Sequence, residues 1–247
     1  LRTLFPYTTL FRSSTTVVNA YLSPVMGRYI ERIDTLFEEL GAQQPTRYFQ
    51  SNGGLAPGVV MRERAVNAIN SGPASAPQAG LCVAQPFGID NVITVDMGGT
   101  SFDITLSKSG RTNFSKDTDF LRYRIGVPMI QVETLGAGGG SIAHIDTFGM
   151  LQVGPRSAGA NPGPVCYGKG GVEPTVTDAN LAFGYLADGA LLGGSIRLNR
   201  QAAIDAIHAK IAVPLGISVE RAAIGIITLV NLNMVSGIRR VSVERGY

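Results

Sequence analysis

The stretch VDMGGTSFDITL, residues 95–106, combines residue types that could hold a phosphorylated ligand. Apolar and polar residues alternate before and after Gly98–Ser101, which is the period of a half-buried strand on each side of a turn. The pattern predicts a hairpin over residues 93–106. Adjacent glycines leave no Cβ in the way, so the backbone N–H groups of such a turn can surround an anion.

Three side chains add to the chemistry that this turn could perform. Asp96, immediately before it, could hold Mg²⁺ through water, and Thr100 and Ser101 offer hydroxyl groups. An ordinary tight hairpin would carry the same pair of glycines. These residues alone therefore leave both a phosphate site and a plain turn open.

Two further glycine-rich stretches resemble nucleotide motifs without matching them. The run at residues 136–140 departs from the pattern GxGxxG because Ser141 occupies the last position. Residues 163–170, GPVCYGKG, match the core of a P-loop, but Gly170 stands where that loop has Ser or Thr, and Pro164 removes a backbone donor. Neither stretch predicts a Rossmann or a P-loop site.

The remaining periodicity predicts an α/β protein. A strand is expected at residues 47–50, ending in the turn SNGGL, and further strands are expected over 111–125 and 129–135. Helices are expected over 16–40 with a possible break at Pro24, from 71 onward, over 177–186, over 199–211, and from Ser218 as N-cap to about Val241.

Composition narrows the class of protein. With 247 residues, 45% hydrophobic and 16% charged, the chain can form one or two globular domains. Cys82 and Cys166 are too few for a disulfide framework and favour a reducing compartment. No apolar run reaches the roughly 18 residues of a membrane span, and neither zinc-ligand spacing nor a nucleic-acid motif occurs. These features argue against membrane and nucleic-acid partners.

The first thirteen residues differ in origin from the rest of the chain. TLFPYTTLFRS, Thr3 to Ser13, is the translation of a common sequencing adapter, as a fragment read from metagenomic DNA could carry. Residues 1–13 are therefore expected to be non-native, with Phe5 and Phe11 outside the core. Without Arg2 and Arg12, 19 basic residues face 18 acidic ones, so the formal charge falls from +3 to +1 and favours no polyanionic partner.

Seven motifs in order carry a resemblance to a known family. They are STTVVNAYLSPVM, QSNGGL, SGPASAPQAG, VDMGGTSFDI, GAGGGSIAHID, VGPRSAGANPGPVCYGKGG and EPTVTDANL. Together they resemble the hydantoinase A family of ATP-dependent N-methylhydantoinases, 5-oxoprolinases and matching ketone-carboxylase subunits. The resemblance implies an actin/Hsp70/sugar-kinase-like (ribonuclease H-like) α/β nucleotide-binding fold, a mixed sheet flanked by helices. Residues 14–247 would be an incomplete fragment of it, truncated at both ends, with the second of two phosphate hairpins at 93–106.

The resemblance also implies an activity. ATP with Mg²⁺ would phosphorylate the carbonyl of a small cyclic amide, and water would then open the ring, with a hydantoinase B-type subunit supplying the hydrolytic step in the cytoplasm. The chain alone would be inactive because half of the phosphate enclosure would be absent. A ketone carboxylase subunit acting on acetone or acetophenone is the alternative enzyme, and an actin-like or chaperone-like nucleotide switch is the alternative outside catalysis.

Site residues follow from the same resemblance. Asp96 would orient Mg²⁺ or its waters, and Asp103 would pin the hairpin or take part directly in catalysis. The second glycine run would bind substrate or phosphate, or form a structural turn. The residues implied to contact the nucleotide are Gly98, Gly99, Thr100, Ser101, Gly138, Gly139 and Gly140.

One position departs from the family pattern. His144 stands where many members have tryptophan, and it could mark a substrate subgroup, a metal ligand or a packing substitution. Cys166 follows in a Gly/Pro-rich loop, but a Cys–His pair has too few ligands to specify a metal site.

Overall fold

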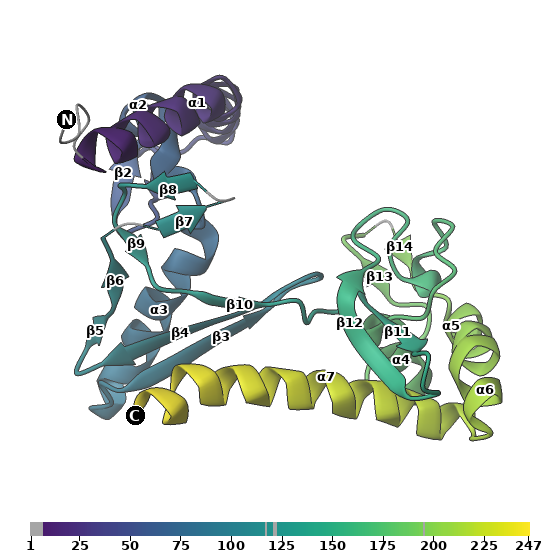
Figure 1. Ribbon diagram of the computed structural model, residues 1–247. Coiled ribbons are helices and arrows are strands. Elements are labelled where there is room, and N and C mark those ends of the chain that lie inside the picture. Colours follow the sequence, from purple (N-terminus) through teal and green to yellow (C-terminus); the bar gives the residue numbers. More distant parts are fainter. Residues whose placement is uncertain (1–6, 117, 121–122, 195) are drawn as a thin grey trace, which may run out of the picture. The chain divides into compact units, whose positions relative to one another are not determined.

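The computed structural model describes residues 7–116, 118–120, 123–194 and 196–247 (Figure 1). The chain forms two compact units, each described here by itself: unit 1 is Leu1–Thr94 with Thr105–Val132, and unit 2 is Val95–Ile104 with Glu133–Tyr247. The predicted hairpin is present as β3 (Val92–Met97) and β4 (Phe102–Lys108). Its tip belongs to unit 2.

Unit 1 is built around α1 (Tyr7–Glu39), which turns an apolar, partly or fully buried residue toward the unit at every fourth position of residues 18–30. This spacing places one residue per turn on the same helix face. The N-terminal part of that face packs in a cluster with Ile125, and its C-terminal part packs in a cluster with Met61. The residues of the face are Val18, Leu22, Met26 and Ile30.

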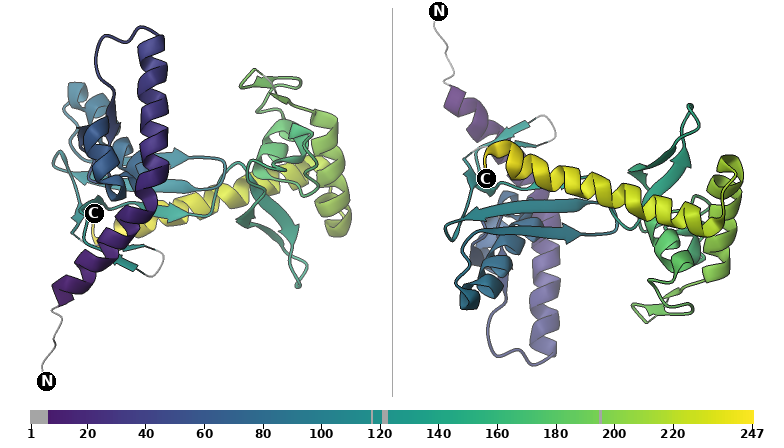
Figure 2. Two further views of the ribbon diagram at one scale, coloured as in Figure 1. Left: turned by 90° about the horizontal axis from the view of Figure 1, so that it is seen from above. Right: turned by 90° about the horizontal axis from the view of Figure 1, so that it is seen from below.

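Helix α1 is continuous through Pro24, so the break considered there does not occur, although Figure 2 shows this N-terminal helix bent partway along its length. Proline removes one N–H donor, but Ala20 and Pro24 are both exposed, so the carbonyl left without a partner can bind water. One residue earlier, the Ser23 hydroxyl donates to the Asn19 carbonyl at 2.7 Å and adds a hydrogen bond to the same turn. The helix therefore tolerates the proline.

The N-terminal segment is described only in part. Phe5 and the side chain of Phe11 lie outside the described residues, so the expectation that they avoid the core stays a prediction. The backbone from Tyr7 onward is helical, and the Thr16 hydroxyl donates to the Arg12 carbonyl at 2.8 Å.

The strands expected in unit 1 are shorter than the sequence pattern indicates. The predicted turn SNGGL joins an antiparallel hairpin, but the apolar residues after the central hairpin are divided among pieces of two or three residues. Successive pieces pair with different strands: β6 pairs with β9, and β7 pairs with β8. The elements are β1 (Arg47–Phe49), β2 (Leu55–Pro57), α2 (Gly58–Glu63), η1 (Ala65–Ala68), α3 (Ser71–Ala84), η2 (Gln85–Phe87), β5 (Arg111–Thr112), β6 (Phe114–Ser115), β7 (Thr118–Phe120), β8 (Tyr123–Ile125) and β9 (Met129–Ile130).

Among its described residues, unit 2 combines antiparallel strand pairs with four α-helices, packed around a main core and a smaller one. β10 pairs with β4, with Thr134 opposite Asp103, and β11 pairs with β12. The elements are β10 (Glu133–Leu135), β11 (Ser141–Ile145), β12 (Leu151–Ser157), η3 (Val165–Tyr167), α4 (Val176–Phe183), β13 (Leu191–Leu192), β14 (Ile196–Arg197), α5 (Arg200–Ile207), the π-helical η4 (His208–Ala212), α6 (Val213–Leu215), α7 (Val219–Val241) and η5 (Val243–Arg245).

Helix α7 has the bounds that the sequence predicts. The Ser218 hydroxyl accepts from the Arg221 N–H at 3.3 Å, and the helix ends at Val241. Among the described residues, the helical stretch Val219–Arg245 is long and apolar enough to span a membrane by length and composition alone, as core helices of globular proteins also are. One face of α7, including Ile226 and Val230, packs in the main core of unit 2.

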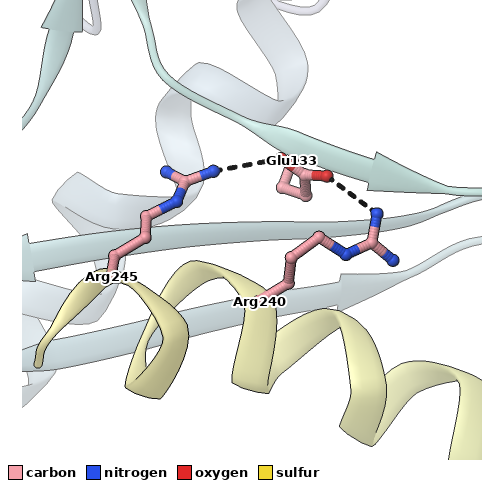
Figure 3. Close-up of polar contacts among 3 residues, drawn as sticks. All are labelled: Glu133, Arg240 and Arg245. Atoms are coloured by element: carbon pink, nitrogen blue, oxygen red, sulfur yellow. Dashed lines mark hydrogen bonds and ion pairs between the residues drawn. The ribbon is translucent and has the colours of Figure 1, made fainter.

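The C-terminal end of α7 is tied to β10 at two levels. Gly237 lies against Leu135 and Ile104, where only hydrogen fits between helix and strands. Farther along, the Glu133 carboxylate lies between two guanidinium groups, 3.4 Å from Arg240 and 3.3 Å from Arg245 (Figure 3). These half-exposed ion pairs contribute little energy each, so the packing at Gly237 is the stronger tie.

We therefore predict that Gly237→Val destabilises unit 2. A Cβ at this position would come within 2.9 Å of the Ile104 Cδ1 atom and closer still to the Leu135 side chain, so these packed side chains or the helix must shift. Overpacking of this kind costs about 1–3 kcal/mol, measurable as a lower urea midpoint. Ser236→Val, on the exposed side of the same turn, is the control and should cost about 0.5 kcal/mol. Equal losses in both variants would contradict the close packing.

Candidate functional site

The tip of the β3–β4 hairpin presents unpaired backbone donors. The Gly98 N–H closes the turn on the Ser101 carbonyl at 2.9 Å. Within the described ranges, the N–H groups of Gly99 and Thr100 have no hydrogen-bond partner, and both residues are exposed. Two adjacent free N–H groups at a glycine turn can bind an anion such as a phosphate oxygen. Gly98, however, uses its own N–H within the turn.

The second glycine run holds this tip from behind. The Gly139 N–H donates to the Gly98 carbonyl at 3.0 Å, and the Gly140 N–H donates to the Gly99 carbonyl at 2.6 Å. The tip carbonyls are thereby tied to the run, while the adjacent tip N–H groups stay free. Because Gly139 and Gly140 spend their donors on the tip, the geometry favours the structural alternative for this run over direct phosphate contact.

This approach of two backbones requires glycine at position 138. A Cβ there would lie 2.7 Å from the Gly99 carbonyl carbon and from the Thr100 nitrogen, and 2.8 Å from the Gly98 oxygen. All three are backbone atoms, which cannot swing aside as a side chain can. The conformation is therefore fixed by the absence of a side chain.

Two residues far along the chain complete the support, and the sequence analysis did not select either. The Thr177 hydroxyl and N–H both donate to the Gly139 carbonyl at 2.8 Å. The Ser157 hydroxyl lies 3.3 Å from the Thr100 hydroxyl and accepts from the Gly159 N–H. Both lie in motifs of the family resemblance, but nothing in their spacing indicates contact with a turn at residues 98–101.

The two carboxylates proposed for chemistry have different surroundings. Asp103 accepts from the Thr134 hydroxyl at 2.5 Å and from the Ser101 hydroxyl at 3.5 Å, which links β4 to β10 and to the tip. Asp96 is exposed, and its carboxylate has no hydrogen-bond or ion-pair partner among the residues that the structure describes. The geometry thus supports a positioning role for Asp103 and leaves Asp96 free to meet a cation.

A third carboxylate, Asp178, organises the Gly/Pro-rich loop. It is fully buried and accepts from the N–H groups of Val165, Cys166 and Thr175 and from the Thr175 hydroxyl, at 2.8 to 3.2 Å. Four donors satisfy the buried charge. Asp178 also forms the capping box that starts α4, beside Thr177.

The metal alternative for His144 and Cys166 gains no support. Cys166 is fully buried, and burial together with the Asp178 carboxylate raises the pKa of its thiol far above the usual value. The Nδ1 atom of His144 is buried without a partner, on β11 opposite Gln152. Among the described residues, no group of three or more His, Cys, Asp or Glu side chains is placed to hold a metal ion.

Comparison with known proteins gives the family context. The family described as Hydantoinase/oxoprolinase matches residues 12–247. Caprolactamase subunit alpha of Pseudomonas jessenii is 94% identical over 236 residues, covering 96% of this chain and 34% of that subunit. 5-oxoprolinase 1 of Arabidopsis thaliana is 39% identical over 181 residues, covering 71% of this chain and 14% of that protein.

Solved structures agree with the sequence comparison. The crystal structure of the ATP-dependent caprolactamase from Pseudomonas jessenii matches with a TM-score of 0.77 over 96% of this chain and 34% of that one. The nucleotide-free acetone carboxylase matches with a TM-score of 0.84 at 31% identity, over 97% and 34%. These likenesses confirm the expected α/β fold class, and the chain spans about a third of each of these two structures.

We predict that Gly138→Ala displaces the tip. The new methyl group would clash with the Gly99–Thr100 peptide, so the bonds donated by Gly139 and Gly140 should open. Hydrogen exchange at these two amides should accelerate, with a stability loss of about 1–3 kcal/mol. Gly99→Ala is the matched control, because a Cβ there meets nothing within 4 Å. Unchanged exchange in Gly138→Ala would show that the two segments are not held together.

We also predict that the two thiols differ in reactivity. Because the pKa of Cys166 is raised, its thiol stays protonated at pH 8, and burial keeps reagents out. Iodoacetamide should therefore alkylate the exposed Cys82 and spare Cys166, as peptide mass spectrometry would show. In denaturant both should react. Equal alkylation in the native protein would contradict the buried, protonated thiol.

Proposed function

Because the chain belongs to the hydantoinase/oxoprolinase family, we propose that it forms the phosphate-contacting part of an ATP-dependent enzyme that opens cyclic amides. The 94% identity to a caprolactamase subunit favours a lactam as the substrate class. The observation that carries the proposal is the pair of unpaired N–H groups at Gly99 and Thr100, on a tip whose carbonyls are tied down behind it.

The free donors of the tip suit a phosphate group. Two N–H groups on adjacent residues can bind one phosphoryl oxygen, and the hydroxyls of Thr100 and Ser157 lie close by as further donors. Since glycine support fixes the tip in advance, little reorganisation is needed when charge develops on the transferred group. The role of this unit would be to position and neutralise, which is what phosphoryl transfer requires.

Asp96 fits the remaining requirement, a carboxylate for Mg²⁺. Magnesium is usually bound by one or two carboxylates together with substrate phosphates and water, so a single free carboxylate next to a phosphate site is sufficient. ATP would supply the phosphoryl group that makes the amide carbonyl more electrophilic. Asp103 would act through the hairpin, by holding Ser101 and β10 in place.

The partners follow from the relatives. The caprolactamase relative is named a subunit alpha, so a partner subunit is expected, and we propose a hydantoinase B-type subunit for the attack of water. Two free cysteines and the use of ATP fit a cytoplasmic setting.

A ketone carboxylase subunit is the second candidate, favoured by the TM-score of 0.84 to acetone carboxylase. A chimera can separate the two. The aligned 236 residues of caprolactamase subunit alpha are replaced by those of this chain, and the protein is assayed with its partner subunit. ATP consumption with lactam would support the proposal. ATP consumption only with ketone and bicarbonate would support the alternative instead.

In this chimera, we predict that Asp96→Asn lowers kcat by roughly 10²–10³-fold, as loss of one preorganised electrostatic group does. The substitution keeps side-chain size but removes the charge that would face Mg²⁺. KM should change much less, because the lost interaction is strongest in the transition state.

Thr100→Val serves as the graded comparison. It should cost less, since the backbone donors of the tip remain. Both variants should have the same melting temperature as the wild type, because neither residue is buried. If Asp96→Asn retains full ATP-dependent ring opening, the proposed metal site is wrong.

A further inference from the structure

Unit 1 contains a polar cavity that the proposed function does not use. Its volume is about 500 Å³, within the range of small-molecule sites. The QSNGGL turn, which joins β1 to β2, provides one wall through Gln50, Ser51 and Asn52. Helix α1, the junction of α2 with η1, and residues 126–128 provide the others.

Hydrogen bonds fix these walls to one another. The Asn19 carboxamide accepts from the Val66 N–H at 3.0 Å and donates to the Glu63 carbonyl at 3.0 Å, so α1 is tied to the segment that carries Arg64. The Ser51 N–H and hydroxyl both donate to the Asn67 carbonyl at 2.7 Å. The cavity is thus built before any ligand arrives, which reduces the entropic cost of binding.

Among the described residues that line this cavity, Arg64 is the one with an ionisable side chain. Its guanidinium has no ion pair and no hydrogen bond within the part of the chain that the structure describes. The side-chain oxygen of Gln50 accepts from the Asn67 amide, and that of Asn52 accepts from the Gly54 N–H. The side-chain nitrogens of Gln50 and Asn52 have no hydrogen-bond partner within the same described residues. The cavity therefore presents one positive charge and two amide donors, and none of its described lining residues carries a carboxylate.

These features select a class of ligand. A guanidinium forms two parallel hydrogen bonds with a carboxylate, and a single cation balances one negative charge better than the several charges of a nucleotide. The free side-chain oxygen of Asn67 adds one acceptor, suited to an N–H group of the same ligand. We propose that this cavity binds a small monocarboxylate that also carries an N–H donor, held at Arg64.

The ring-opened product of a cyclic amide is a member of that class, since opening an amide yields a carboxylate and an amine. Only this identification rests on the proposed function. Occupation of the cavity by such an amino acid would make the chain responsive to its own product. An exposed arginine alone would not support this, because Arg62 on α2 is also exposed but lines no part of the cavity.

The test is calorimetry on the whole chain with 6-aminohexanoate, in the absence of ATP. We expect saturable binding that Arg64→Gln weakens about 10-fold or more, the typical effect of losing a charge-assisted hydrogen bond. Arg64→Lys keeps the positive charge but cannot form two parallel hydrogen bonds with a carboxylate, so this variant should bind with intermediate affinity. Arg62→Gln is the matched control and should bind as wild type. Circular dichroism would confirm that each variant is folded.

Competing probes make the outcome decisive. Binding of ε-caprolactam or inorganic phosphate as tightly as 6-aminohexanoate would overturn the carboxylate assignment. No binding at about 10 mM, or equal weakening by Arg62→Gln, would overturn the site itself. None of these measurements involves Asp96 or ATP turnover, so failure here leaves the proposed function standing, and failure of the Asp96 test leaves this site standing.

Discussion

The approach of two backbone segments in unit 2 is the constraint on which the candidate site depends. Gly138 to Gly140 lie so close to the hairpin tip that a single methyl group would separate them. Because they are close, the tip carbonyls accept hydrogen bonds from the run, and the tip N–H groups are left without intramolecular partners. A turn satisfied on its carbonyl side and unsatisfied on its N–H side is suited to bind an anion. Without the glycines it would be an ordinary hairpin.

The rest of unit 2 holds that contact in place from several directions. Thr177 anchors the run from the start of α4, whose capping box depends on the buried Asp178. On the other side, α7 packs against β10, and β10 pairs with the strand that follows the tip. Helix caps and core packing therefore support the glycine run whose two hydrogen bonds hold the tip. This arrangement leaves the tip exposed and still ordered.

Local signals in the sequence predicted some of this architecture well. The Gly-Gly turn between alternating segments gave the hairpin, and Ser218 gave the start of α7, because both signals act over a few neighbouring residues. Pro24 is also a local signal, but it wrongly suggested a break in α1. The cost of one lost N–H donor depends on whether water can bind the carbonyl left without a partner, and neighbouring residues in the sequence do not reveal this. The role of Gly138 was unpredictable, because its partner lies some 40 residues away in the chain and the spacing carries no trace of it. Arg64 was overlooked for the same reason.

Three aspartates show how surroundings decide the role of one residue type. Asp178, buried and bound by four donors, can only be structural, since any change of charge would leave those donors unsatisfied. Asp103, with two hydroxyl donors, couples a strand to the tip. Asp96 has no partner among the described residues, so its charge is uncompensated within them. An uncompensated carboxylate beside free N–H donors would repel a phosphate unless a cation lay between them. If the tip binds phosphate as proposed, a cation at Asp96 would offset this repulsion.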